Sequence, residues 1–220
     1  MRDILRSRAL ADIPHGFSTR DGLEAEDILA NSVPVRVTQV HSAHAAIADS
    51  AWATPPEADA IVTATRGLAL AIVTADCAPV LLSDNAAGVV AAAHAGWRGA
   101  LEGVLENTVD AMCKLGAHPA SISAAIGPTI AQSSYEVDGN FRTRFAEADH
   151  RFFAPGRAGH WQFDLPGYVA ERLRAAGVSR IDDLSEDTYT QTDRFYSFRR
   201  ATHLGEDTGG RQISMVTLPR

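Results

Sequence analysis

Residues 68–74 read LALAIVT, residues 75–82 read ADCAPVLL and, after the turn Ser83-Asp84-Asn85, residues 88–93 read GVVAAA. Nearly continuous apolar runs of this length are typical of strands that are covered on both faces. They predict three buried strands at 68–74, 79–82 and 88–93. Residues with reactive side chains follow directly where two of these strands end, at Asp76-Cys77 and at His94.

Further strands and helices are predicted on either side of this core. The N-terminal part, through Asn31, contains turn residues and is expected to be loop with a short helix. Short apolar runs predict four more strands, and three- and four-residue apolar spacings closed by glycine predict helices. The strands are expected at 35–40, 60–64, 121–126 and 213–218, and the helices at 100–115, 139–148 and 165–176. This mixture predicts an α/β protein with a single domain over residues 1–220.

Composition excludes several classes of protein. The chain has 220 residues with 20 basic and 27 acidic side chains, a formal net charge of −7. Nucleic-acid-binding modules carry a basic patch instead, so we expect no nucleic-acid partner. No apolar stretch approaches the ~18 residues of a membrane span, and no secretory signal is visible. Two cysteines do not form a secreted disulfide pattern, so a reducing cytoplasm is the expected compartment.

Three residues at predicted strand ends form a candidate metal site. Cys77 follows the strand at 68–74, His94 follows the strand at 88–93, and His41 follows the strand at 35–40. A thiolate and two imidazoles suit Zn²⁺, and three protein ligands leave a fourth position open. The wide spacings of these residues are unlike those of a zinc finger. The alternative is a free cysteine that merely packs in the core, which is the expectation for Cys113.

Several charged residues are candidates for binding an anion or moving a proton. Gly96-Trp97-Arg98-Gly99 precedes a predicted helix, so its N–H groups and the Arg98 guanidinium could face a phosphate; an ordinary glycine turn is the alternative. Arg199 and Arg200, with Arg211 nearby, either pair with the acidic excess or line an anion pocket. Asp76 is a possible acid/base, or else a carboxylate that orients a histidine ligand.

Five groups of motifs, in order along the chain, resemble one known family. They are Gln39–Ser42; Ala58–Ala60 with Val73–Val80; His94–Gly99; Gly127-Pro128 with Tyr135–Val137; and Tyr196–Arg200 followed by Gly210-Arg211. Together they resemble the YfiH-type laccase-domain family, also described as multicopper polyphenol oxidoreductase-like and as purine nucleoside phosphorylase. The resemblance runs from about Gly16 to Leu218 and so covers nearly the whole chain.

The resemblance implies a four-layer α/β/β/α sandwich and a metal held by His41, Cys77 and His94. It also implies phosphorolysis of purine nucleosides, with adenosine deamination as a related activity, and it places Arg20 in the active-site pocket. Two departures from the family pattern are visible. The segment between Arg20 and His41 is short, and Asp187 stands where relatives often have cysteine.

The leading hypothesis is a cytoplasmic, zinc-dependent enzyme that acts on small nucleosides and phosphate. Its substrates would be adenosine, inosine, guanosine or methylthioadenosine. The expected catalytic residues are Cys77, Asp76 and Arg98; the substrate-binding residues are Arg20, Arg98, Arg199 and Arg200; and the metal ligands are His41, Cys77 and His94.

Two other chemistries remain open. One Cys and two His resemble a blue-copper ligand set, which would suit a copper-dependent polyphenol oxidoreductase, although eight scattered histidines are few for several copper ions. A cysteine hydrolase that edits cell-wall peptide precursors would instead use Cys77 as nucleophile and His94 as base.

Overall fold

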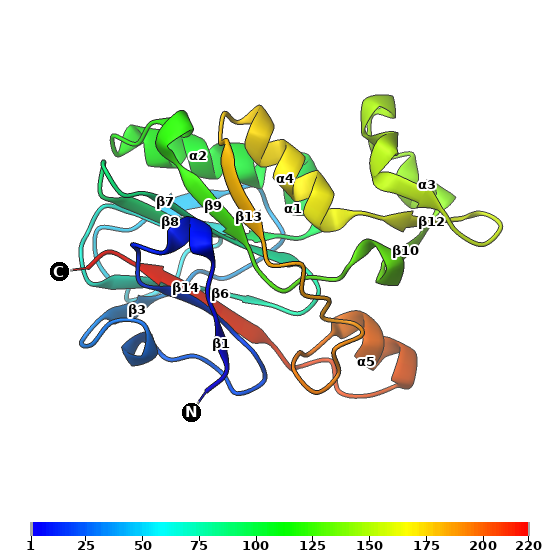
Figure 1. Cartoon of the computed structure of the whole chain (residues 1–220), viewed down its shortest axis with the longest axis horizontal. Coiled ribbons are helices and arrows are strands. Elements are labelled where there is room, and N and C mark those ends of the chain that lie inside the picture. Colours follow the sequence, from blue (N-terminus) through cyan, green and yellow to red (C-terminus); the bar gives the residue numbers. More distant parts are fainter. Residues whose placement is uncertain (1, 220) are drawn as a thin grey trace.

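The computed structural model describes residues 2–219 and contains two β-sheets stacked face to face (Figure 1). In spatial order, the six-stranded sheet contains β13 (Arg180–Asp183), β9 (Ser123–Ile126), β7 (Ala78–Asp84), β8 (Val89–Ala95), β5 (Ala60–Thr63) and β4 (Ala45–Ile47). The five-stranded sheet contains β1 (Ile4–Leu5), β2 (His15–Ser18), β14 (Gln212–Thr217), β6 (Leu68–Thr74) and β3 (Val33–Val35). Both sheets mix parallel and antiparallel pairs, which confirms the predicted α/β class.

The strands predicted from residues 68–93 form the centre of the sandwich. β6 has the predicted bounds, β7 extends the strand predicted at 79–82 at both ends, and β8 begins one residue later and ends two residues later than the strand predicted at 88–93. Leu70 and Ile72 of β6 pack between the sheets against Leu81 of β7, whereas Ala69 and Ala71 lie in the cluster on the opposite face of β6. This alternation explains the continuous apolar run, because both faces of the strand are covered.

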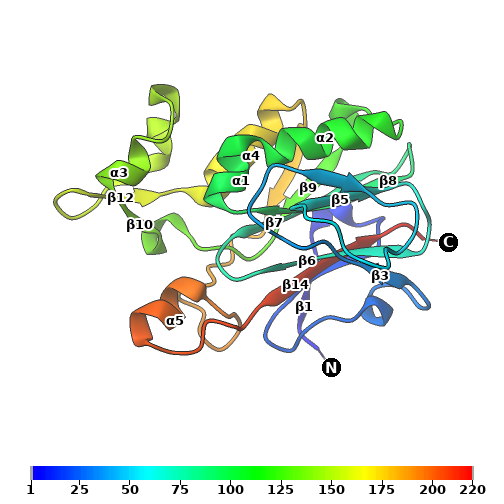
Figure 2. The same ribbon diagram turned by 180° about the vertical axis from the view of Figure 1, so that it is seen from behind.

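Three helices cover the outer face of the six-stranded sheet, namely α1 (Trp97–Glu102), α2 (Val104–Lys114) and α4 (Leu165–Ala175) (Figures 1 and 2). The helix expected over 100–115 is interrupted at Gly103, which ends α1 and begins α2. Gly103 has φ +99°, a left-handed conformation that glycine adopts without a steric penalty. α4 agrees with the predicted helix at 165–176.

The outer face of the five-stranded sheet has a much thinner cover. In the place of a second helical layer lies the 3-10 turn η2 (Ala25–Asp27), where Leu23 and Ala25 pack on Ala69 and Met215. The short connection from Arg20 to His41 must supply both this cover and β3. It therefore has room for one 3-10 turn, so the fourth layer of the expected sandwich is reduced to that turn and its loops.

A three-stranded sheet projects from one end of the sandwich, close to α5 (Phe198–Leu204) (Figures 1 and 2). It consists of β10 (Glu136–Asp138), β12 (His160–Phe163) and β11 (Phe153–Pro155), with α3 (Gly139–Arg142) and η5 (Glu147–Phe152) beside it. The prediction of one helix over 139–148 was wrong. Phe141 and Phe145, at helical spacing, do meet at 5.4 Å between ring centroids, but they belong to an aromatic cluster with Phe153 and Phe163.

Two N-terminal expectations were also wrong. β2 lies in the region expected to be loop, and all four of its residues are buried beside β14. The strand expected over 35–40 ends at Val35, after which only an isolated bridge joins Thr38 to Glu57. Leaving the sheet allows this segment to approach the ends of β6 and β8.

Short 3-10 turns complete the connections: η1 (Arg8–Leu10), η3 (Pro119–Ser121) and η4 (Gln132–Ser134). Among residues 2–219, no helix is both long and apolar enough to cross a lipid bilayer.

Packing between the sheets leads to a stability prediction at Gly127. A Cβ atom there would lie 2.2 Å from Cδ1 of Phe17, which is fully buried. Overpacking of this kind destabilises by about 1–3 kcal/mol, so Gly127→Ala should lower the free energy of unfolding measured with denaturant. Gly139→Ala is the control, because its Cβ would meet no atom closer than 3.9 Å. Equal stability of the two variants would contradict this packing.

Candidate active site and metal centre

The structure brings the three predicted ligands together at one end of the sandwich. One ligand atom from each of His41, Cys77 and His94 lies within 4.8 Å of the others. Cys77 Sγ is 3.9 Å from His41 Nε2, and the two imidazole centroids are 4.8 Å apart. Cys77 occupies the turn between β6 and β7, and His94 lies in β8 next to Pro79 of β7. The hairpin register therefore places two ligands side by side, and the loop after β3 brings the third.

The buried carboxylate of Asp59 holds both histidines. It accepts hydrogen bonds from the backbone N–H groups of Val40, His41 and Ser42, and from the Ser42 hydroxyl. These bonds fix a loop in which His41 has φ +60°. Asp59 also accepts a 2.8 Å hydrogen bond from His94 Nδ1, and its backbone carbonyl accepts the His94 N–H at 2.7 Å. Because Nδ1 is occupied, Nε2 is the His94 atom left for a ligand.

Electrostatics favour the charged form of the cysteine. Burial raises the pKa of the Cys77 thiol, but hydrogen bonding to His41 and His94 outweighs burial and lowers it to about 6. For His94, burial lowers the pKa of the imidazole. Hydrogen bonds and charges from Asp59 and Cys77 outweigh burial and raise this pKa to about 9. At neutral pH, metal-free Cys77 is therefore a thiolate beside a protonated imidazole.

The donor set and its surroundings fit a metal ion. Zinc bonds of ~2.0 Å to nitrogen and ~2.3 Å to sulfur place tetrahedral donors ~3.5 Å apart, close to the 3.9 Å between His41 and Cys77. Gly96 closes the site from one side: a Cβ there would lie 2.9 Å from Cys77 Sγ and 3.2 Å from His41 Cδ2. Three ligands of this kind leave one coordination position for a substrate atom.

The ligands open into a cavity of about 450 Å³ with aromatic and cationic walls. Trp97, Tyr135 and Phe198 line it, and Phe198 is half exposed. Arg199 and Arg211 also line it, and among residues 2–219 neither has a carboxylate within ion-pair distance. Arg199 donates to the Glu136 carbonyl and Arg211 to two carbonyls of its own loop, so their charges remain available to an anion.

Three other predicted arginines lie outside the lining of this cavity. Arg20 stacks at 4.5 Å over the ring of Tyr196 and lines a neighbouring hollow. The buried Arg200 guanidinium donates to the carbonyls of Thr188, Tyr189 and Phe195, which is a structural role. Arg98 is exposed beside the Trp97 ring, at the start of a helix of only six residues.

The residue that sequence reasoning missed is Asp59. The carboxylate that orients a histidine is that of Asp59, whereas Asp76 accepts its hydrogen bonds from Thr188, Ser197 and the backbone of Arg199. Asp59 stands in the motif Ala58-Asp59-Ala60, but an aspartate before a short apolar run gives no sign of the long-range bond to His94.

Comparison with known proteins shows the family of the chain. The family model described as multi-copper polyphenol oxidoreductase laccase matches residues 18–219. The chain belongs to this family. The resemblance stated from the sequence motifs is thereby confirmed.

Relatives of similar sequence carry the name purine nucleoside phosphorylase. One from Rickettsia conorii is 38% identical over 199 residues, which is 89% of this chain and 80% of the relative. Purine nucleoside phosphorylase YfiH of Escherichia coli is 35% identical over 189 residues, 85% of this chain and 74% of that protein.

Solved structures show the same fold over the whole chain. The crystal structure of Neisseria meningitidis NMB0706 has a TM-score of 0.86 at 29% identity, covering 100% of this chain and 99% of that one. YlmD from Geobacillus stearothermophilus has a TM-score of 0.87 at 25% identity, covering 100% and 97%.

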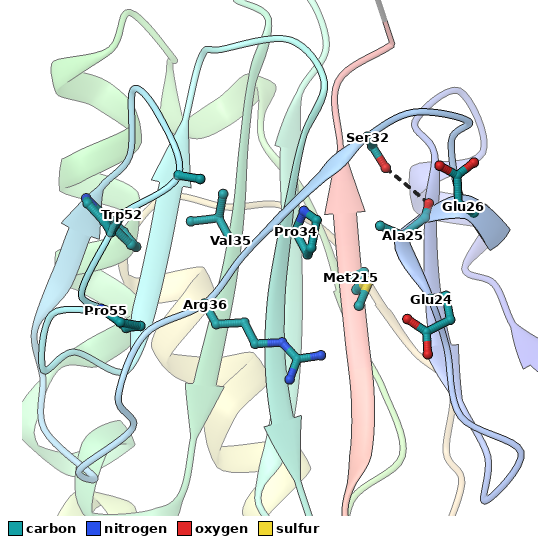
Figure 3. Close-up of a pocket in the computed structure, with 11 residues that line it drawn as sticks. Glu24, Ala25, Glu26, Ser32, Pro34, Val35, Arg36, Trp52, Pro55 and Met215 are labelled. Carbon is teal, nitrogen blue, oxygen red and sulfur yellow. Dashed lines mark hydrogen bonds between the residues drawn. The ribbon is translucent and has the colours of Figure 1, made fainter.

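A second cavity, also of about 450 Å³, lies on the outer face of the five-stranded sheet (Figure 3). Met215 and Pro34 form its floor, and the charges of Glu24, Glu26 and Arg36 surround it. None of the three metal-ligand candidates reaches it. It is the hollow left beside the thin cover of this sheet.

The low pKa of Cys77 predicts its reactivity in metal-free protein. Because a lowered pKa means that the thiolate persists above that value, alkylation of Cys77 by iodoacetamide should rise through about pH 6 and then level off. Cys113 is the internal control: burial first, and then Asp110, raise its pKa, so its rate should still increase in alkaline solution. Peptide mass spectrometry resolves the two sites. A shared alkaline midpoint for both cysteines would contradict the proposed environment of Cys77.

The role of Asp59 predicts a loss of metal affinity. Asp59→Asn removes the charge that holds His94 and the His41 loop, so zinc affinity should fall about 10–100-fold in chelator competition. Asp84→Asn is the matched control, because Asp84 is a buried carboxylate at the other end of β7 that accepts the N–H groups of Ala87 and His118. Equal zinc affinities in the two variants would exclude this role.

Proposed function

We propose that this protein is a zinc-dependent purine nucleoside phosphorylase acting on adenosine, inosine, guanosine or methylthioadenosine. One observation carries the proposal. The His41–Cys77–His94 group opens into the same aromatic-walled cavity as two arginines, which have no carboxylate partner among residues 2–219. The names of the relatives support the class of reaction.

Arg199 and Arg211 would bind the phosphate. Acidic side chains outnumber basic ones in this chain, which has a net charge of −7. Even so, no ion pair among the described residues includes either guanidinium. Guanidinium groups bind phosphate through paired, charge-assisted hydrogen bonds. Two of them in one cavity would bind and orient a phosphate for attack.

The aromatic side chains would bind the purine. Trp97, Tyr135 and Phe198 line the cavity, and aromatic side chains there would pack against a flat base. Burial first, and then the negative charge of Cys77, raise the pKa of Tyr135, so its hydroxyl stays protonated and can donate to a purine nitrogen. In the reaction, a phosphate oxygen bonds to C1′ of the ribose while the C1′–N9 bond breaks and the base takes the electron pair.

His41, Cys77 and His94 would hold the zinc. When bound there, Zn²⁺ would supply a Lewis acid at the coordination position that faces the cavity. Asp59 keeps the His94 ring in place, and Gly96 leaves space beside the ligands. Adenosine deamination is proposed as a second reaction of the same cavity, in which a water oxygen bonds to C6 and ammonia leaves.

Product analysis of the zinc-loaded protein tests this proposal. With inosine or adenosine and phosphate, we expect free base and ribose 1-phosphate in equal amounts, and no base without phosphate. Deamination would appear separately as inosine formed from adenosine. Cys77→Ala should lower turnover to below about one hundredth by removing a metal ligand, whereas Cys113→Ala should keep the wild-type rate. Wild-type turnover no higher than that of Cys77→Ala would refute the proposal.

A cysteine hydrolase is a second candidate, favoured by the thiolate-forming Cys77 beside His94. In that case Cys77 would attack a peptide-precursor carbonyl, and chelator-treated protein would be the active form. A covalent Cys77 adduct formed with substrate in metal-free protein would favour this chemistry; activity that returns only on adding zinc would exclude it.

The family description suggests copper-dependent oxidation of phenols as a further alternative. Within residues 2–219, however, only one cluster of histidine, cysteine and acidic side chains could hold a metal. Oxidation by several copper ions needs several such clusters. The single cluster therefore speaks against multicopper oxidation. We propose zinc as the metal because a thiolate and two imidazoles with an open fourth position suit Zn²⁺.

A further inference from the structure

Asp76 joins parts of the chain that are far apart in sequence. Its carboxylate accepts hydrogen bonds from the Thr188 hydroxyl at 2.6 Å, the Ser197 hydroxyl at 3.0 Å and the Arg199 backbone N–H at 2.6 Å. These donors are more than 100 residues away along the chain. The side chain is almost fully buried, so its charge is met by these three donors.

The backbone of Asp76 is fixed as firmly as its side chain. Its carbonyl accepts the Thr129 hydroxyl at 2.7 Å and the Ile130 N–H at 3.0 Å. Its φ of +82° lies in the left-handed region, which costs most residues energy and is tolerated best by Gly, Asn and Asp. Asp76 therefore connects the β6–β7 turn to the loop after β9 and to the start of α5.

The hydrogen bonds of Asp76 reach residues that line the cavity. Cys77, the metal-ligand candidate, is the next residue in the chain, and the bonded Arg199 and its neighbour Phe198 both line the cavity. The hydrogen bond from the Arg199 N–H fixes the first turn of α5, from which the guanidinium reaches the wall. The hydrogen bond to His94 is made by Asp59 instead. Asp76 itself lines the cavity, and its carboxylate accepts from Thr188, Ser197 and Arg199.

We propose that Asp76 is a positioning residue that holds Phe198 and Arg199 at a fixed distance from the Cys77 ligand and thereby sets the affinity of the cavity for phosphate. The inference rests on the proposed function. It gives Asp76 no part in proton transfer, in contrast to the acid/base role that was one of the two roles considered from the sequence.

Two substitutions separate the carboxylate from the backbone. Asp76→Gly removes the carboxylate but adopts a positive φ freely, so the turn and the Cys77 ligand should keep their places. Asp76→Asn keeps the shape and one acceptor oxygen. Thr188→Val removes one of the three donors without changing the side-chain volume much, at a fully buried position.

Asp187 provides the matched control. Its carboxylate also joins loops of this region by accepting hydrogen bonds from Ala131, Ser134, Tyr189 and Thr190. The hydrogen bonds of Arg199 go to Asp76 and Glu136 instead. Asp187→Asn should therefore reproduce a general loosening of loops without moving Arg199.

The first measurement is binding of inorganic phosphate to the zinc-loaded proteins by calorimetry. We expect one bound zinc in every variant, and a Kd for phosphate raised about tenfold or more in Asp76→Gly and Asp76→Asn. Thr188→Val should give a smaller rise, and Asp187→Asn none. In turnover assays, the Asp76 variants should have a raised KM for phosphate. Their rate should still fall on both the acidic and the alkaline side of the pH profile, as in the wild type.

Amide hydrogen exchange provides a readout independent of phosphate. Exchange at Arg199 should become faster in Asp76→Gly but not in Asp187→Asn, because only the first variant loses the acceptor of that N–H.

Unchanged exchange in Asp76→Gly would overturn the positioning role. Unchanged phosphate affinity together with loss of one limb of the pH–rate profile would also overturn it, in favour of proton transfer. If the wild-type protein neither binds phosphate nor releases base, the proposed function fails, while exchange at Arg199 still decides whether Asp76 positions this segment.

Discussion

The carboxylate of Asp59 is the group on which the geometry of the candidate metal centre depends. It directly precedes β5, is fully buried, and accepts five hydrogen bonds from the His41 loop and from His94. Burial alone would raise its pKa, but the hydrogen bonds from His94 and Ser42 outweigh burial and lower it, so the group stays ionised. A buried charge is tolerated only when it is paired and fully hydrogen-bonded. The same bonds that satisfy Asp59 also fix two of the three ligands.

Two buried carboxylates, Asp59 and Asp76, each fix a different side of the cavity. Asp59 fixes the histidine side, through the loop after β3 and through β8. Asp76 fixes the opposite wall, through the start of α5. Cys77 follows Asp76 directly and contacts His41, so it lies where the two networks meet. The stacked sheets supply the rigid base, because the ligands and Asp59 lie at or beside the ends of β5, β6, β7 and β8.

Features set by local sequence patterns could be predicted, whereas features set by contacts between segments far apart in sequence could not. The strands at 68–93 were predictable because burial on both faces leaves a continuous apolar run. That Cys77 and His94 meet was predictable because both stand at strand ends, whereas His41 lies in a loop that leaves the sheet after Val35. β2 was not predictable, since its four residues show no alternation and are buried only by pairing with the C-terminal β14. The roles of Asp59 and of the arginines depend on contacts between distant segments, which the sequence does not reveal. Arg199 and Arg200 are adjacent in sequence, yet Arg199 lines the cavity and the buried Arg200 donates to the Phe195 carbonyl.

X-ray absorption at the zinc edge of the loaded wild-type protein is the most direct measurement on this centre. We expect one zinc per chain, with one sulfur ligand at ~2.3 Å and the remaining nitrogen or oxygen ligands at ~2.0 Å. The imidazole signal should correspond to two histidines. A spectrum without sulfur, or one with two sulfur ligands, would contradict a centre built from His41, Cys77 and His94.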